Sequence, residues 1–157
     1  MRLYHGSNVP VTTPKIIVSN RALDFGAGFY TTSDIKQAQR WAELQVRRRG
    51  SGKAIVTAYE ISESLLKKAF VRHFPYADSG WLEFISANRK KIYTGPVYDL
   101  VIGPVANDNT MPVINDYIAG NISEETALIL LKPQKLSDQY VFLTAAGLRM
   151  LSEGVVL

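Results

Sequence analysis

The 157-residue sequence predicts a single α+β domain that spans residues 1–157. Short segments rich in β-branched and aromatic residues are interspersed with segments whose apolar residues recur every three or four positions, patterns typical of strands and helices respectively. The two kinds of element follow no regular βαβ alternation, which favours α+β over a doubly wound parallel sheet. No repeat, low-complexity segment or linker divides the chain.

Local signals predict where the elements lie. Strands are expected at residues 2–5, 54–61, 69–71, 98–103, 136–143 and 155–157, with a further β stretch at 16–18. Helices are expected at 34–49, 62–66, 79–88, 111–119, 123–131 and 145–152. Ser33-Asp34, Ser79, Ser123 and Thr144 are the expected N-caps.

Composition narrows the class of protein. Hydrophobic residues make up 46 % of the chain and charged residues 20 %, which is ordinary for a globular domain. The absence of cysteine excludes disulfides, thiolate catalysis and cysteine zinc sites. There is no signal-peptide pattern and no apolar run near the ~18 residues that a membrane span needs. We therefore expect a cytoplasmic protein that does not associate with a membrane.

A glycine-rich turn lies at Asp24-Phe25-Gly26-Ala27-Gly28-Phe29-Tyr30-Thr31-Thr32. Glycine is favoured where the backbone takes a positive φ or where another group must approach the main chain closely. The Phe-Tyr-Thr-Thr end has strand composition, so the turn would present Tyr30 where it becomes a strand. Taken alone, this pattern favours a structural turn with a core tyrosine.

Two histidines are candidate functional residues. His5 ends the first strand, immediately before Gly6-Ser7, whereas His73 lies in a mixed loop and is read as incidental. A hydrogen-bonded histidine at a strand end is the simplest interpretation of His5. No His-Glu-x-x-His motif or acid cluster accompanies either residue, so no metal site is expected.

Three motifs, taken together, resemble a known family. Leu3-Tyr4-His5-Gly6-Ser7, Gly26-Ala27-Gly28-Phe29-Tyr30 and Asp138-Gln139-Tyr140-Val141-Phe142 follow the order of motifs in ADP-ribosyltransferases of the diphtheria-toxin and poly(ADP-ribose) polymerase type. Those enzymes carry a His-Tyr-Glu triad on three strands. The resemblance implies a split β-sheet core with flanking helices and NAD as the substrate. It is strongest to a bacterial branch whose members resemble toxins encoded beside a small antitoxin protein, which implies such a protein as a partner.

The resemblance also implies roles for individual residues. His5 would hydrogen-bond the adenosine ribose, the Gly6 backbone would hold the nicotinamide amide and Ser7 could add a hydroxyl contact. Tyr30 would stack on the nicotinamide ring. Trp41 would supply a second aromatic face, with core packing as its equally weighted alternative. The neighbours of Tyr30 in its motif are also expected to line the NAD site: Gly28, Phe29 and Thr31.

Gln139 departs from the family pattern. It occupies the position of the catalytic glutamate, and an amide accepts hydrogen bonds but brings no negative charge and cannot act as a general base. Catalysis would then be slow, use another acid, or be absent. Among candidate acids, Asp108 is preferred to Asp138 and Glu83 because it lies in a loop, with an Asx turn as its structural alternative.

Several functions therefore stay open at this stage. The first is ADP-ribosyl transfer to a protein or nucleic-acid target, and the others are NAD glycohydrolysis and NAD or ADP-ribose binding without turnover. A phosphotransferase acting on RNA 2′-phosphates shares the general fold, but it normally uses extra arginines near the first motif, where this chain has only Arg2 and Arg21. The basic runs 47–49 and 89–91 close helices, where cations are favourable, and their functional alternative is contact with NAD pyrophosphate or nucleic acid.

Overall fold

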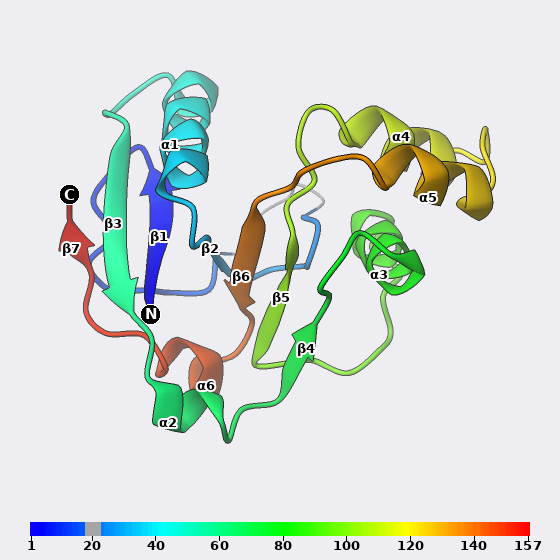
Figure 1. Ribbon diagram of the computed structural model, residues 1–157. Helices are drawn as coiled ribbons and strands as arrows, with labels where there is room; N and C mark the ends of the chain where they lie inside the picture. The colour runs from blue at the N-terminus through cyan, green and yellow to red at the C-terminus, as the bar shows by residue number, and fades with distance from the viewer. Residues whose placement is uncertain (18–22) are drawn as a thin grey trace.

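The computed structural model describes residues 1–17 and 23–157 as a mixture of helices and strands (Figure 1), which confirms the α+β class. In chain order the elements are β1 (Arg2–Ser7), β2 (Phe29–Thr31), α1 (Ile35–Arg49), β3 (Ile55–Glu60), α2 (Glu63–Leu66), β4 (Val71–His73), α3 (Ser79–Arg89), β5 (Leu100–Pro104), α4 (Met111–Ile118), α5 (Glu124–Leu131), β6 (Asp138–Phe142), α6 (Ala145–Leu148) and β7 (Val155–Val156).

The strands form two sheets, one in the order β1-β3-β7 and the other in the order β2-β6-β5-β4. All pairs are antiparallel except β4–β5, which is parallel. A single bridge joins β1 to the end of β2: the N–H of Tyr4 donates to the Thr32 carbonyl at 2.8 Å, and the N–H of Thr32 donates back at 2.9 Å. Strands β1, β2 and β6 are consequently neighbours in that order (Figure 1).

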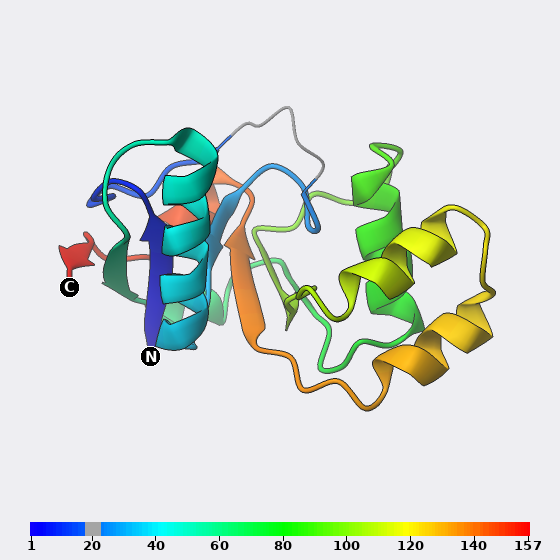
Figure 2. The same cartoon turned by 90° about the horizontal axis from the view of Figure 1, so that it is seen from above.

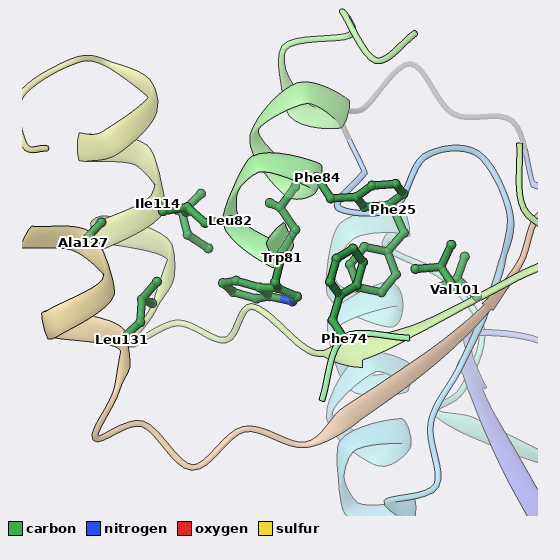
Figure 3. Close-up of a cluster of buried hydrophobic side chains, with 11 residues drawn as sticks. Phe25, Phe74, Trp81, Leu82, Phe84, Val101, Ile114, Ala127 and Leu131 are labelled. Carbon is green, nitrogen blue, oxygen red and sulfur yellow. The ribbon is translucent and has the colours of Figure 1, made fainter. Parts of the chain in front are cut away.

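Two clusters of buried apolar side chains hold the layers together. The larger lies between the β2-β6-β5-β4 sheet and helices α3, α4 and α5 (Figure 3); we call it the aromatic cluster, and it comprises Phe25, Phe74, Trp81, Leu82, Phe84, Ile85, Val101, Ile114, Ala127, Leu131 and Val141. The second joins the two sheets through Leu3, Phe29, Tyr59, Ile61, Leu100, Phe142 and Met150. Figure 2 shows α1 over β1 at one end of the molecule and the α3–α5 group at the other.

Helix α1 lies close to β1 because the residues at their contact, Gly6 on the strand and Ala38 and Ala42 on the helix, have small side chains or none. Asp34 caps the helix by accepting from the N–H of Lys36 at 3.0 Å, and Gly50 ends it with a φ of 67°. At Gly6 of β1, an added Cβ would lie 1.9 Å from the carbonyl oxygen of Ala38. Only small side chains fit such a contact, and Ala38 is fully buried. Ile35, which was expected on the same buried face, is 37 % exposed.

Some predicted boundaries differ from the structure. The N-cap of α3 is Asp78 rather than Ser79, since its carboxylate accepts from the N–H of Trp81 at 2.9 Å. The final helix ends at Leu148 rather than at residue 152, because Leu151 bridges to Ile61 and residue 152 bonds the end of β3. In the expected β stretch at 16–18, Ile17 forms one bridge to Gly28. Val18 and Arg21 lie outside the described residues.

Candidate functional site

His5 links the two sheets through its side chain. The ring is 7 % exposed and stacks on Phe29, with centroids 4.3 Å apart. Its Nδ1 lies 2.7 Å from the carbonyl oxygen of Tyr30. Because a carbonyl only accepts, Nδ1 carries the proton and Nε2 is the acceptor of the neutral ring. Burial lowers the pKa of His5 and outweighs the opposing effect of the Tyr30 bond, which favours that neutral form.

Tyr30 has a structural task within the glycine turn. Its hydroxyl donates to the Gly26 carbonyl at 2.7 Å and accepts from the N–H of Phe25 at 3.0 Å. Burial raises the pKa of Tyr30 well above its ordinary value, so the phenol stays protonated. The Tyr30 ring is half-buried and packs against the aromatic cluster, and its hydroxyl holds the turn. A stacking contact between this ring and nicotinamide stays a prediction.

The turn itself is anchored by α3. Gly26 has a φ of 90°, which favours glycine. Asp24 pairs with Arg89 at 2.8 Å, and burial raises the pKa of Asp24 while Arg89 lowers it. Arg89, expected only as a helix-closing cation, thus has a specific partner 65 residues away. In the sequence, the only hint of this pair was Asp24 itself, the acidic residue at the start of the glycine motif.

Strands β1 and β2 are joined at the Tyr4–Thr32 bridge. We call the boundary between the two strands next to this bridge the seam, and the backbone of Gly6 faces it. Tyr4 directs both its N–H and its C=O to Thr32, and alternate residues of a strand direct these groups to the same side. Gly6 therefore turns its N–H and C=O toward β2, at the level of Tyr30. There the Tyr30 carbonyl accepts the His5 Nδ1–H. The seam between the sheets is thus bordered by His5, Gly6 and Tyr30.

Gln139 lies on β6, the strand paired with β2, and is 2 % exposed. Its Nε2 donates to the Pro104 carbonyl at 3.3 Å, and the same oxygen accepts from Trp81 Nε1 at 3.0 Å. Since the amide nitrogen is used in this way, Oε1 is the end of the side chain left to accept a hydrogen bond from another group. Gln139 shares its face of the sheet with Val141, beside the aromatic cluster.

Trp41 and the remaining residues of the glycine motif have different surroundings. Trp41 is half-buried and is not part of either buried cluster formed by the described residues. Thr31 is fully buried and its hydroxyl donates to the Tyr140 carbonyl at 2.8 Å. Gly28 packs so closely against β6 that an added Cβ would lie 2.8 Å from the Phe142 carbonyl oxygen. These contacts give Thr31 and Gly28 roles within the sheet.

The candidate acids differ in position: Asp138 is bonded next to the β1–β2 bridge, through the Thr32 hydroxyl at 3.4 Å, whereas Asp108 and Glu83 lie on other elements. Asp108 is exposed in the loop between β5 and α4, where the Asx turn is made by its neighbour Asn107 rather than by Asp108. Glu83 accepts from the Tyr117 hydroxyl at 2.6 Å. The Asp138 carboxylate accepts from the N–H of Ser33 at 2.8 Å and from its hydroxyl. No contact among the described residues joins Asp108 to the seam.

Ser7 completes the predicted set. It follows Gly6 in β1, is half-buried, and its hydroxyl lies 3.4 Å from Asn8 Oδ1. Over residues 1–17 and 23–157, no cluster of three or more His, Cys, Asp or Glu side chains could hold a metal ion. In the same part of the chain, no helix combines the length and apolarity needed to cross a membrane.

The two-sheet domain and its seam belong to a family that sequence comparison identifies. Residues 1–152 match the model of DUF3990, a family described as proteins of unknown function, and the chain is a member of that family. No curated protein and no solved structure matches the chain.

Proposed function

We propose that the protein is an NAD-dependent ADP-ribosyltransferase whose core is the split sheet formed around β1, β2 and β6. The observation that carries the proposal is the 2.7 Å hydrogen bond from His5 to the Tyr30 carbonyl. It joins the His-Gly strand to the Gly-x-Gly-x-Tyr strand at the seam, with Gln139 on the next strand. The family that these motifs resemble carries its triad on three strands of a split sheet.

NAD would bind with its nicotinamide end at the seam. The N–H and C=O of Gly6, which are directed toward β2 at the seam, would pair with the nicotinamide amide, and the absence of a side chain allows close approach. Trp41 offers a half-buried aromatic face, and such stacking is worth about 0.5–1.5 kcal/mol beyond burial. Nε2 of His5 would accept a hydrogen bond from a ribose hydroxyl, while the hydrogen bond from Nδ1 to the Tyr30 carbonyl fixes the ring.

In the reaction, the bond between the nicotinamide nitrogen and ribose C1′ breaks, and its electron pair neutralises the pyridinium. An acceptor atom then bonds C1′ and releases a proton. Gln139 Oε1 would accept a hydrogen bond from a hydroxyl of the nicotinamide ribose and so orient the ribose, without the negative charge that a glutamate brings. Loss of one such electrostatic element typically costs about 2.7–4 kcal/mol in the barrier, so turnover is expected to be slow.

The amide at position 139 also favours a second candidate function. A domain that binds NAD or ADP-ribose without turnover keeps the contacts of His5, Gly6 and Trp41 and needs no carboxylate. NAD glycohydrolysis is the variant in which water takes the acceptor's place. The proposal further includes a toxin role in the cytoplasm with a small antitoxin protein as partner, which is supported by the resemblance to the toxin-like bacterial branch.

Incubation with NAD labelled in the adenylate moiety tests the proposal. Nicotinamide release above background, and label transferred to a macromolecule of a cell extract, are the expected results. Free ADP-ribose alone would favour glycohydrolysis, and tight calorimetric binding with no release would favour the binding module. No binding and no release would overturn the proposal.

Matched variants of His5 separate chemistry from folding. In His5→Asn the side-chain N–H can still donate to the Tyr30 carbonyl, but the Nε2 acceptor is gone. Nicotinamide release should fall at least tenfold while the melting temperature stays near that of the wild type. His5→Ala should lose both activity and stability. Equal activity in His5→Asn and the wild type would contradict a ligand contact at Nε2.

Two variants of Trp41 provide a similar test of ligand contact. Trp41→Phe keeps an aromatic face and should retain most NAD affinity, whereas Trp41→Ala should weaken it about fivefold, in line with the energy of one stacked pair. The unfolding free energy should change little in Trp41→Phe. Identical NAD dissociation constants for both variants, measured by calorimetry, would place Trp41 outside the ligand contact.

A further inference from the structure

Helix α1 and the turn after it hold an excess of positive charge. The segment has six cations and one acid, Glu43, whereas the net charge of the whole chain is only +4; the cations are Lys36, Arg40, Arg47, Arg48, Arg49 and Lys53. The helix dipole accounts for arginines in the last turn, where cations are favourable. It does not account for Lys36, which lies in a first turn that contains no acid. Helix stability alone therefore does not explain this charge.

The cations form a stripe on the outer side of the helix. At 3.6 residues per turn, Lys36, Arg40 and Arg47 lie on one side, away from the buried Ala38 and Ala42. All three cations are exposed and span about 16 Å along the axis. Arg40 lies 3.8 Å from the Asp34 carboxylate, an exposed ion pair that contributes little. The stripe also includes Glu43, which reduces its charge without reversing it.

The composition of this face fits a nucleic acid better than a protein. Protein interfaces depend on apolar and aromatic anchors at a core depleted of charge. Among the large exposed hydrophobic residues of the described chain, α1 contributes only Ile35, at 37 % exposure. Arginine, in contrast, matches phosphate with a planar fork of donors. A row of cations without apolar anchors is typical of backbone binding, which is electrostatic and independent of base sequence.

We infer that the outer face of α1 binds the phosphate backbone of a nucleic acid, and that this nucleic acid is the acceptor of ADP-ribose. The second half of the inference rests on the proposed function. Helix α1 packs on Gly6 at the seam through Ala38 and Ala42, on the side opposite the stripe, so the stripe lies about one helix diameter, roughly 10–12 Å, from the proposed nicotinamide site. A strand bound along the stripe would reach that site around the helix, and a nucleophilic atom of the strand would bond ribose C1′ as nicotinamide leaves and a proton is released.

Binding can be tested without NAD. Fluorescence anisotropy would measure the affinity of the full chain for labelled single-stranded and duplex oligonucleotides of DNA and RNA over a range of salt concentrations. Lys36→Gln/Arg40→Gln/Arg47→Gln should weaken binding at least tenfold and reduce the salt slope by about 2 to 3, since each lost phosphate contact removes about 0.7–0.9. The control is Lys67→Gln/Lys68→Gln/Lys132→Gln, which removes the same charge from exposed residues elsewhere and should leave affinity nearly unchanged.

Equal losses in the two triple variants, or no binding by the wild type, would overturn the inference, provided that melting temperatures show both variants folded. Preferential binding of labelled poly-L-glutamate would also overturn it, in favour of an acidic protein partner. Label transfer from NAD to the bound oligonucleotide, lost in the α1 variant, would support the acceptor assignment. Nicotinamide release measured without nucleic acid reports separately on the proposed function. If NAD is cleaved but no oligonucleotide binds, only this inference is overturned. If oligonucleotides bind but no nicotinamide is released, only the acceptor role is overturned.

Discussion

The two ends of the molecule are stabilised in different ways. Around α3–α5, the buried side chains are large and apolar: Trp81, Leu82 and Ile114 are fully buried, and Phe84 contacts Phe25 and Phe74 edge-on or tilted. Around the seam, several buried side chains are polar, and each is held by a hydrogen bond, as His5 is by the Tyr30 carbonyl. Apolar burial tolerates small shifts, whereas hydrogen bonds fix position. The side chains at the seam are therefore held in more closely defined positions than those of the aromatic cluster.

The largest effect is expected at the apolar end. Trp81→Ala removes the largest fully buried side chain and the indole N–H that bonds the Pro104 carbonyl. Deletions of this kind cost about 3–5 kcal/mol, measurable by urea unfolding. Tyr76→Ala is the control, because Tyr76 is 73 % exposed and should change stability by less than about 0.5 kcal/mol. Similar values for the two variants would contradict the importance of the aromatic cluster.

The next effect is expected where the two ends meet. Gln139→Glu would introduce the carboxylate that the ADP-ribosyltransferases resembled by these motifs carry, but would place it, 2 % exposed, beside the Pro104 carbonyl. A buried, unpaired carboxylate has a raised pKa in the folded state, so the penalty is absent below the unfolded pKa of about 4.3 and grows as pH rises through and above it. We expect a loss of about 3 kcal/mol at neutral pH.

Urea unfolding at about pH 4 and pH 8 measures this difference. Gln139→Met, which has similar volume and no charge, should show no such pH dependence. A stable Gln139→Glu protein with faster nicotinamide release would indicate instead that the seam accommodates a carboxylate at this position, and would strengthen the enzyme hypothesis over the binding module.

A smaller effect is expected between α1 and β1. Gly6→Ala places a methyl group against the Ala38 carbonyl oxygen, at 1.9 Å if nothing moves. Overpacking of this kind costs about 1–3 kcal/mol, and if the proposed function holds, displacing α1 also weakens NAD binding. Ser7→Ala, the adjacent half-buried position, is the control and should be nearly neutral. The checks are thermal unfolding and calorimetric NAD titration, and unchanged values for Gly6→Ala would contradict the close packing.

The smallest effect is the pH dependence due to His5. Its folded-state pKa is lowered from 6.5, so the unfolded chain binds more protons as pH falls below that value. The free energy of unfolding should therefore rise between pH 5 and 7, with a slope of at most about 1.4 kcal/mol per pH unit. His5→Asn does not titrate and should have a flatter profile. Parallel profiles for the two proteins would contradict a neutral buried His5.

Elements with local signals could be predicted from the sequence, and long-range contacts could not. Helix α1 begins after Asp34 and ends at Gly50 because capping depends on neighbouring residues. The environment of Gln139 depends on Pro104, 35 residues away, and on Trp81. The Asp24–Arg89 pair spans 65 residues. Neither contact leaves a periodic pattern in the sequence.

The candidate site was predictable only in part, for the same reason. The motif order singled out His5, Tyr30 and Gln139 as candidates. It could not show that the Tyr30 hydroxyl bonds within the turn while the Tyr30 carbonyl accepts from His5, because those contacts depend on the register between strands. Asp108 was preferred on loop position alone, and the structure leaves it exposed beyond β5, outside the seam.

The pairing of β2 with β6 has a consequence for when the domain can form. Thr31 bonds Tyr140, 109 residues later, and β6 is a central strand of its sheet. Contacts so distant in sequence slow folding because a long loop must close first. A chain interrupted before residue 138 lacks the strand that joins β2 to β5, and with it Gln139. The four-stranded sheet that holds β2 is thus completed late during synthesis, and unfinished chains of this protein are expected to lack its ordered structure.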